Sequence, residues 1–261
     1  MISWLWNGTA FVRRKHIPVS DRGFRYGMSV FETIKVWEGK PQFLDRHLSR
    51  LRSACAERDI PWDEPALEKV EKLLSKMTFK GVARLYATAG DGGPAAKVTD
   101  SRLLVICEER EAETETSYQV NIHDEDYRPL FLGLKTANYW FNADALAQAR
   151  ARKADEALLF NDLGELVSAC MANVFLVRDD QVYTPSRASG CRGGVIRDWV
   201  IRRRNTIEKR LRREDVLKAD EIFITNSWLG VMPVSTVEGR PVGPSMIGRK
   251  LAGALEVRMQ E

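Results

Sequence analysis

The side chains that most often carry out catalysis are sparse in this sequence and show no familiar spacing. The 261 residues include three histidines, His16, His47 and His123, and four cysteines without a CxxC pair. Because zinc sites are built from such pairs and from clustered histidines, we expect no metal centre. The dinucleotide-binding, P-loop, GxSxG and HExxH motifs are also absent from the sequence. The ordinary motifs therefore predict no particular reaction.

One lysine stands out because of the residues that precede it. The apolar segment Leu130-Phe131-Leu132-Gly133-Leu134 predicts a buried strand that leads into Lys135. Burying an unpaired ammonium is costly, so burial favours the uncharged amine. An uncharged lysine amine can attack an aldehyde. From the residues alone, a surface charge is the alternative interpretation of Lys135.

The segments that must position such residues alternate between hairpins and helices. Turn residues that adopt positive φ between short apolar runs predict a chain rich in antiparallel strands. These turns are Asn7-Gly8, Glu38-Gly39, Leu163-Gly164, Asp179-Asp180 and Glu238-Gly239. Apolar residues at helical spacing predict helices, the second with Asp63 as its N-cap. The predicted helices span 44–58, 65–77, 142–153, 197–204 and 245–259.

A polar stretch marks the predicted domain boundary. Residues Glu108–Ser117 are almost all acidic or hydroxylic, and apolar strands are predicted on both sides, at 103–107 and 118–122. We expect a small N-terminal α/β domain over residues 1–110 and a larger C-terminal domain over 118–261. The fold class is then α+β with two lobes, and clefts between lobes commonly hold ligands.

Charge and hydropathy favour a protein that acts on small molecules. The formal net charge is +4, and the richest basic segment, 197–213, is interpreted as a solvated helix face and strand end, so we expect no nucleic-acid partner. No apolar run approaches the ~18 residues that span a membrane, and the N-terminus lacks a signal-peptide pattern. We therefore expect a cytoplasmic protein with reduced thiols, no membrane partner and a small-molecule substrate.

Five blocks of the sequence begin Ser20-Asp21-Arg22-Gly23, Leu134-Lys135-Thr136-Ala137-Asn138-Tyr139, Met171-Ala172-Asn173-Val174-Phe175, Gly193-Gly194-Val195-Ile196-Arg197 and Thr225-Asn226-Ser227. In this order they resemble the class IV aminotransferase family, also called the fold type IV enzymes of pyridoxal 5′-phosphate (PLP). The family includes branched-chain and D-amino-acid aminotransferases and 4-amino-4-deoxychorismate lyase. The resemblance covers nearly the whole chain. It implies a two-domain fold type IV architecture, PLP bound by the larger, pseudo-barrel C-terminal domain, and a homodimer.

The resemblance also implies a cofactor site. Its positions here are Arg50, Lys135, Tyr139, Ser168, Asn173, Val195, Ile196, Asn226 and Ser227. In the family pattern Lys135 carries PLP as a Schiff base and later moves the proton at the substrate carbon. Tyr139 matches a tyrosine that approaches the phenolic oxygen of the cofactor in some members.

The cofactor phosphate needs fixed donors. By resemblance these are the Arg50 guanidinium, the backbone amides of Val195 and Ile196 at the start of a helix, and the Ser227 hydroxyl. Most of the family has threonine where Ile196 stands, so one hydroxyl contact is missing here.

The departure with the largest chemical consequence is at Ser168. Most of the family has glutamate there, which bonds the pyridine nitrogen and keeps it protonated. Serine supplies no charge, so the ring is expected to withdraw electrons less strongly. Glu165 is three residues away and on a strand would point to the opposite face unless the register shifts.

Three functions stay open at this stage. The Phe31-Glu32-Thr33 segment resembles aminotransferases, which move an amino group from an amino acid to a 2-oxo acid. The short chain and the segment 169–173 resemble 4-amino-4-deoxychorismate lyase, which releases pyruvate and 4-aminobenzoate. The missing glutamate at Ser168 also fits a PLP-binding homologue that has lost turnover. For the substrate, an amino acid or an amino-chorismate, we expect contacts from Phe31 and from Arg84, whose charge suits a carboxylate.

Overall fold

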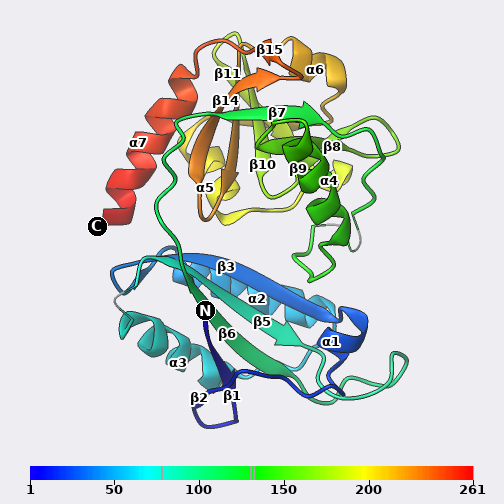
Figure 1. Ribbon diagram of the computed structural model, residues 1–261, viewed down its shortest axis with the longest axis vertical. Helices are drawn as coiled ribbons and strands as arrows, with labels where there is room; N and C mark the ends of the chain where they lie inside the picture. The colour runs from blue at the N-terminus through cyan, green and yellow to red at the C-terminus, as the bar shows by residue number, and fades with distance from the viewer. Residues whose placement is uncertain (78, 130, 132, 261) are drawn as a thin grey trace. The chain divides into compact units, whose positions relative to one another are not determined.

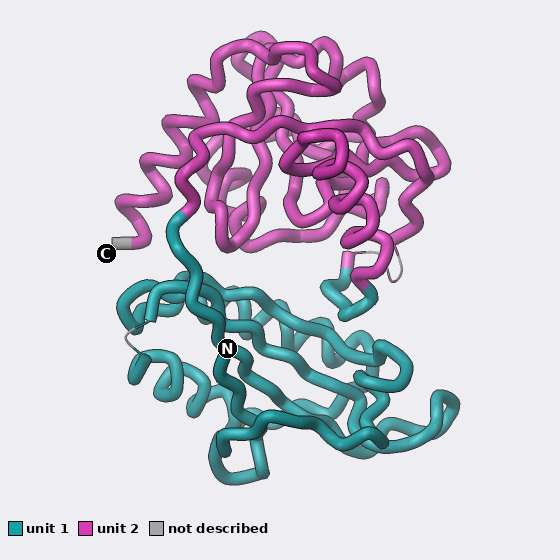
Figure 2. The backbone as a smooth tube through the Cα atoms, viewed as in Figure 1, with its two compact units in different colours: residues 1–112, 134–138 teal, residues 113–133, 139–261 magenta. Residues whose placement is uncertain are grey.

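The computed structural model describes residues 1–77, 79–129, 131 and 133–260, which form two compact units (Figures 1 and 2). Unit 1 contains Met1–Ala112 and Leu134–Asn138, and unit 2 contains Glu113–Gly133 and Tyr139–Glu261. The domain ranges 1–110 and 118–261 stay predictions. The units differ from them in one respect, because the short segment that carries Lys135 packs with unit 1.

Unit 1 is built on a six-stranded antiparallel sheet in the order β2-β1-β6-β5-β3-β4. The strands are β1 Ile2–Trp6, β2 Phe11–Arg13, β3 Ser29–Trp37, β4 Lys40–Pro41, β5 Gly81–Thr88 and β6 Arg102–Glu109. The helices are α1 Arg22–Tyr26, α2 Leu44–Glu57 and α3 Glu64–Ser75, and Figure 1 shows α2 and α3 against the sheet.

The core of unit 1 follows from the two-residue period of its strands. On β3 the residues Val30, Ile34 and Val36 are buried together with Leu51 of α2 and Val70 of α3. The helical spacing thus predicted α2 and α3 correctly within a few residues. Asp63 is the N-cap of α3, as predicted, but its side chain makes no cap hydrogen bond and instead accepts one from Trp6 Nε1 at 2.5 Å.

Unit 2 is built on a nine-stranded sheet in the order β12-β11-β10-β13-β14-β7-β8-β9, with β15 paired to β14. The strands are β7 Tyr118–Ile122, β8 Glu156–Phe160, β9 Leu166–Ala169, β10 Asn173–Arg178, β11 Gln181–Pro185, β12 Thr206–Lys209, β13 Glu221–Asn226, β14 Gly230–Val237 and β15 Arg240–Pro241. The helices are α4 Trp140–Ala151, α5 Val195–Arg203, α6 Arg213–Leu217 and α7 Met246–Gln260, with a 3₁₀ turn η1 at Arg187–Ser189.

The sheet of unit 2 curls into a barrel-like wall. Strand β9, at the end of the order, contacts β10 near its middle, and the amide of Ala169 donates to the carbonyl of Ala172 at 2.8 Å. The apolar side chains inside this wall include Leu158, Val174, Ile222 and Val234, all essentially inaccessible to water. Helices α5 and α7 lie against β13 and β14.

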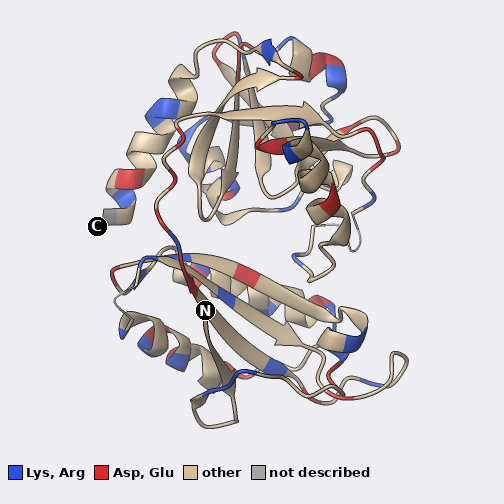
Figure 3. Cartoon of the chain, in the orientation of Figure 1, with Lys and Arg blue, Asp and Glu red and all other residues tan. Residues whose placement is uncertain are grey.

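Charges of both signs are spread along both units, as the sequence composition suggested (Figure 3). Among the residues that the structure describes, no helix combines the length and apolarity needed to cross a membrane.

Candidate functional site

Lys135 is held beside strand β3 and not at the end of a strand of its own. The amide of Phe31 donates to the carbonyl of Lys135 at 2.9 Å, and Thr136 bridges Val30. The Lys135 Nζ lies 4.2 Å from the centre of the Phe31 ring, which in turn stacks on Tyr86 at 4.8 Å. A cation over an aromatic face is stabilised there, so Phe31 fixes the position of the amine.

The predicted buried strand before Lys135 is wrong for the residues that are described. Phe131 is 47% exposed and has φ of 55°, and Gly133 has φ of 86°. Left-handed backbone at both positions is incompatible with a strand. Leu130 and Leu132, which also carried the prediction, lie outside the described residues. Lys135 is half-buried, and its surroundings come from β3.

A buried charge network lies next to Lys135 in unit 1. The carboxylate of Glu32 accepts from His47 Nδ1 at 2.7 Å, from Arg50 Nε at 2.6 Å and from Arg50 Nη2 at 2.5 Å. Arg50, expected at the cofactor phosphate, therefore donates to Glu32 through both Nε and Nη2. Glu32 and His47 were not predicted as site residues. The signal was available, because Glu32 is a charged residue on the β3 face that carries Val30 and Ile34.

Electrostatics fix the protonation of this network. Burial raises the pKa of Glu32, but the Arg50 charge and the bonds from His47 and Arg50 outweigh it and hold the pKa at about 2. For His47, burial lowers the pKa, the bond from Glu32 raises it, and the charges of Arg50 and Lys135 lower it further, with a net decrease. At neutral pH the network is thus a carboxylate, a guanidinium and a neutral imidazole.

Arg84 forms an ion pair with a neighbouring carboxylate. It pairs with Glu108 across β5 and β6 at 2.7 Å, and both side chains are about one quarter exposed. The bond from Arg84 lowers the pKa of Glu108, although burial opposes the shift. In the β3–β5 register Phe31 faces Tyr86 and Thr33 faces Arg84, so these side chains share one face of the sheet. The substrate roles of Phe31 and Arg84 stay predictions.

In unit 2 the start of α5 leaves backbone donors available. Gly194 is the N-cap and no side chain caps the helix; the first helical bond runs from Asp198 N to Gly194 O at 2.9 Å. The amides of Val195 and Ile196 therefore have no acceptor within the helix. Their side chains are buried, at 4% and 2% exposure, so only their backbone could serve a ligand.

The two glycines before α5 lie in close contact with neighbouring side chains. A Cβ on Gly193 would lie 2.1 Å from Arg187 Nη1, and a Cβ on Gly194 would lie 2.1 Å from Asn173 Oδ1. The Asn173 side chain also donates to the carbonyl of Arg192 at 2.7 Å, so it holds this loop in place.

A buried hydroxyl lies on the same side of the sheet. Thr225 faces Asn173 in the β10–β13 register, and α5 packs against β13. Thr225 is 1% exposed, and its Oγ1 has no hydrogen-bond partner among the residues that the structure describes. Open helix amides, glycines in close contact and a buried unpaired hydroxyl together fit the phosphate group of PLP. The fifth sequence block contained Thr225, but only its pairing with Asn173 shows on which face of the sheet its side chain lies.

Asn226 and Ser227 belong to the turn after β13. The Asn226 Oδ1 accepts from the amides of Trp228 and Leu229 at 2.9 and 2.8 Å, and its Nδ2 donates to the carbonyl of Met171 at 3.3 Å. Asn226 therefore shapes the turn that presents Ser227, which is half-buried.

Ser168 is half-buried on β9, opposite Leu159 of β8. The register does shift between Leu159 and Phe160, so the irregularity considered from the sequence exists. It does not bring Glu165 to the Ser168 position. The Glu165 carboxylate accepts from Arg210 Nη1 at 2.9 Å and from Asn161 Nδ2 at 3.4 Å.

Tyr139 contacts a second arginine. The Arg192 Nη1 donates to the Tyr139 hydroxyl at 2.7 Å, and the guanidinium carbon lies 5.5 Å from the centre of the ring. Tyr139 follows Lys135 by four positions in the chain. The role of Tyr139 at the cofactor stays a prediction.

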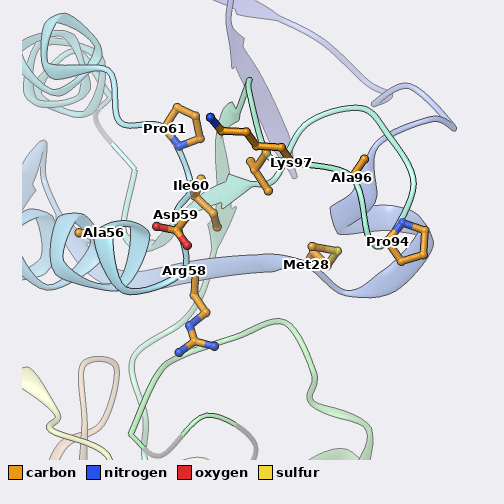
Figure 4. A pocket seen from close by; sticks show the side chains of 10 residues that line it. Met28, Ala56, Arg58, Asp59, Ile60, Pro61, Pro94, Ala96 and Lys97 are labelled. Carbon is orange, nitrogen blue, oxygen red and sulfur yellow. The ribbon is translucent and has the colours of Figure 1, made fainter.

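Unit 1 also has an open cavity of about 800 Å³ between the end of α2 and the loop before β6 (Figure 4). Its lining includes Arg58, Asp59 and Lys97, and Met28 lies at one side. None of the predicted site residues lines it.

Comparison with known proteins gives a consistent result. The family model of class IV amino-transferases matches residues 29–237. The D-alanine aminotransferase of Bacillus licheniformis is 27% identical over 262 residues, covering 94% of this chain and 91% of that protein. The aminodeoxychorismate lyase of Bacillus subtilis (strain 168) is 30% identical over 241 residues, covering 84% of this chain and 80% of that protein.

A solved structure is similar to this chain over nearly its whole length. The crystal structure of 4-amino-4-deoxychorismate lyase from Pseudomonas aeruginosa matches with a TM-score of 0.88 at 26% identity, covering 98% of each chain. This chain belongs to the class IV aminotransferase family and is an enzyme of that PLP-dependent family. The predicted family and the two-lobe α+β architecture of fold type IV are confirmed.

Proposed function

We propose that this enzyme binds PLP through Lys135 and acts as a 4-amino-4-deoxychorismate lyase, which releases pyruvate and leaves 4-aminobenzoate. The observation that carries the choice of activity is at Ser168. Glu165, three residues away, does not take the place of the usual glutamate, because it is buried and bonded to Arg210 and Asn161. A reaction that forms an aromatic ring demands less electron withdrawal from the cofactor than amino transfer does.

Lys135 would supply the amine that holds PLP. The amides of Val195 and Ile196 and the hydroxyls of Thr225 and Ser227 would supply donors to its phosphate. Bound PLP supplies an aromatic ring that takes up the electrons released when a proton leaves the substrate carbon. The proposal keeps Arg50 as a phosphate ligand.

The chain's own chemistry is a proton transfer at one amine. The Lys135 Nζ lies 4.2 Å from the centre of the Phe31 ring, and its charge lowers the pKa of His47. The Lys135 amine takes the proton from the ring carbon that bears the substrate amino group. The ether bond to the three-carbon side chain then breaks, the side chain leaves as pyruvate after gaining a proton, and the ring becomes aromatic.

Amino transfer between an amino acid and a 2-oxo acid is the second candidate. It is favoured by the match to D-alanine aminotransferase over 94% of this chain. The site residues serve it equally well except at Ser168, where the uncharged partner disfavours the strong electron withdrawal that amino transfer uses.

One experiment separates these functions. PLP-loaded protein is given 4-amino-4-deoxychorismate, and 4-aminobenzoate is followed by fluorescence and pyruvate by a coupled dehydrogenase. We expect equal amounts of both products, and none from Lys135→Ala. A parallel sample receives pooled L- and D-amino acids. Loss of the yellow colour there without 4-aminobenzoate in the first sample would establish the aminotransferase. No change in either sample would favour a PLP-binding homologue without turnover.

A further inference from the structure

The turn between β9 and β10, residues 169–172, is held by side chains from three other elements of unit 2. The Ala169 amide closes the turn by donating to the Ala172 carbonyl at 2.8 Å. The three side chains that bond its backbone are Asn142 of α4, which donates to the Cys170 carbonyl at 2.8 Å, Glu156 of β8, which accepts from the Met171 amide at 3.1 Å, and Asn226 of β13, which donates to the Met171 carbonyl at 3.3 Å. The position of this turn is therefore fixed by contacts distant in sequence.

The turn is next to candidate residues of the cofactor site. Ser168 of β9 directly precedes it. Asn226 joins it to a second turn, because the Asn226 Oδ1 accepts from the two amides that follow Ser227. Met171 is thus bonded to Glu156 through its amide and to Asn226 through its carbonyl. A displacement of Met171 therefore disturbs both Ser168 and the turn that presents Ser227.

A carboxyl group is an unfavourable choice for this position. Glu156 is 3% exposed, and its Oε2 is buried with no hydrogen-bond partner among the residues that the structure describes. Leu158, two residues further along β8 and so on the same face of the strand, lies in the apolar core. Because burying a charge or an unpaired polar atom is costly, this carboxyl group calls for a functional explanation.

Glu156 changes its charge near neutral pH. Burial raises its pKa to about 7, although the bond from the Met171 amide opposes the increase. The titratable side chains on which it acts are Tyr118 of β7 and Cys170 of the turn. The pKa of each is raised chiefly by burial, and the charge of Glu156 adds to the increase, so both are neutral at pH 7.

The protonated form of Glu156 suits the closed turn. Below pH 7 the carboxyl group accepts from the Met171 amide and brings no charge into the core. As pH rises through 7, the ionised group is left with one buried oxygen that has no donor. Opening of the turn to water then relieves the cost of the buried charge, and such local opening requires less free energy than unfolding of the whole chain.

We propose that Glu156 is a positioning residue, which holds the 169–172 turn through the Met171 amide and thereby keeps Ser168 and the Asn226 turn in the arrangement that binds PLP. This inference rests on the proposed function, since it takes Ser168 and Ser227 as residues of the PLP site. It follows that ionisation of Glu156 weakens the binding of PLP.

The test compares the full-length wild type with Glu156→Gln, which keeps an acceptor but does not titrate, and with Glu156→Leu, which removes the acceptor. The matched control is Glu221→Gln. Glu221 is a buried carboxyl at the opposite end of β13 from Asn226, and it accepts from the amides of Ile247 and Gly248 at 2.9 and 3.4 Å. Two quantities are measured between pH 6 and 9: hydrogen exchange of the amides of 169–172 without PLP, and the dissociation constant of PLP.

The expected results separate the three variants. In the wild type, exchange of the Met171 amide relative to its intrinsic rate should rise by up to about tenfold per pH unit above pH 7, because opening is then linked to loss of one proton. The ratio of the PLP dissociation constants of wild type and Glu156→Gln should rise over the same range, since ionisations of PLP itself cancel in this ratio. Glu156→Leu should exchange rapidly and bind PLP about tenfold more weakly at every pH, because the Met171 amide loses its acceptor. Glu221→Gln should follow the wild type in both measurements.

The inference is overturned if wild type and Glu156→Gln show the same pH dependence of PLP affinity. An exchange rate at 169–172 that responds to Glu156 while PLP affinity does not would show a structural role alone, and would also overturn it. If Glu156→Leu does not fold, the comparison of wild type with Glu156→Gln decides. A wild-type protein that binds no PLP would instead refute the proposed function, whereas the exchange measurement would still report whether Glu156 holds the turn.

Discussion

Replacing Glu32 with glutamine should destabilise the protein strongly and in a pH-dependent way. The pKa of this carboxyl falls from 4.5 to about 2, and each pKa unit corresponds to 1.36 kcal/mol. Its ionised form therefore stabilises the fold by about 3 kcal/mol at neutral pH. The side chain is 2% exposed, so solvent screens this contribution little. Breaking a buried pair by removing one partner costs a similar amount.

The pH window follows from the direction of the shift. The stabilisation is fully present above pH 4.5 and is lost as pH falls towards 2, because protonation then occurs in both folded and unfolded chains. The free energies of unfolding of wild type and Glu32→Gln, measured with urea, should differ by about 3 kcal/mol at pH 7, and the difference should be smaller at pH 3. Glu108→Gln is the matched control; its pair with Arg84 is about one quarter exposed, so its loss should cost under about 1 kcal/mol.

The reasoning on Glu32 is refuted if Glu32→Gln and Glu108→Gln destabilise equally at pH 7. It is also refuted if the Glu32→Gln difference is independent of pH between 3 and 7.

Three further predictions concern unit 2. Burial raises the pKa of Glu156 to about 7. Glu156→Gln should therefore equal the wild type in free energy of unfolding below pH 4.5 and exceed it by up to about 3 kcal/mol above pH 7. Equal pH profiles of the two proteins in urea unfolding would contradict this prediction. Gly194→Ala should weaken PLP binding tenfold or more, because the new Cβ would lie 2.1 Å from Asn173 Oδ1. Gly253→Ala is the control: the space around its Cβ is open, so the affinity for PLP should stay unchanged. Ser168→Glu should raise the pyridine protonation seen by nitrogen NMR of labelled PLP, and an unchanged signal would show that the position does not contact the ring.

Local patterns were sufficient to predict most elements. Helical spacing predicted α2, α3, α4, α5 and α7 within a few residues, and the turn residues predicted the hairpins such as β1–β2 around Asn7-Gly8. The short helices α1 and α6 were missed, because five residues carry too little periodicity.

The site was harder to predict because its geometry depends on contacts distant in sequence. Arg50 could be assigned to a cofactor phosphate from a motif, but its grip on Glu32 depends on how α2 packs on β3. The apolar residues before Lys135 predict a strand from hydropathy, whereas in the structure a hydrogen bond from β3 holds Lys135. Thr225 becomes a candidate only once β10 and β13 are paired.

The central claim is that Lys135 holds the cofactor, and chemical trapping tests it most directly. PLP-loaded protein is reduced with borohydride, digested and analysed by mass spectrometry for the lysine that carries the pyridoxyl group. The account predicts modification at Lys135 in the wild type and none in Lys135→Ala. Modification of a different lysine in the wild type, or covalent fixation that persists in Lys135→Ala, would contradict it.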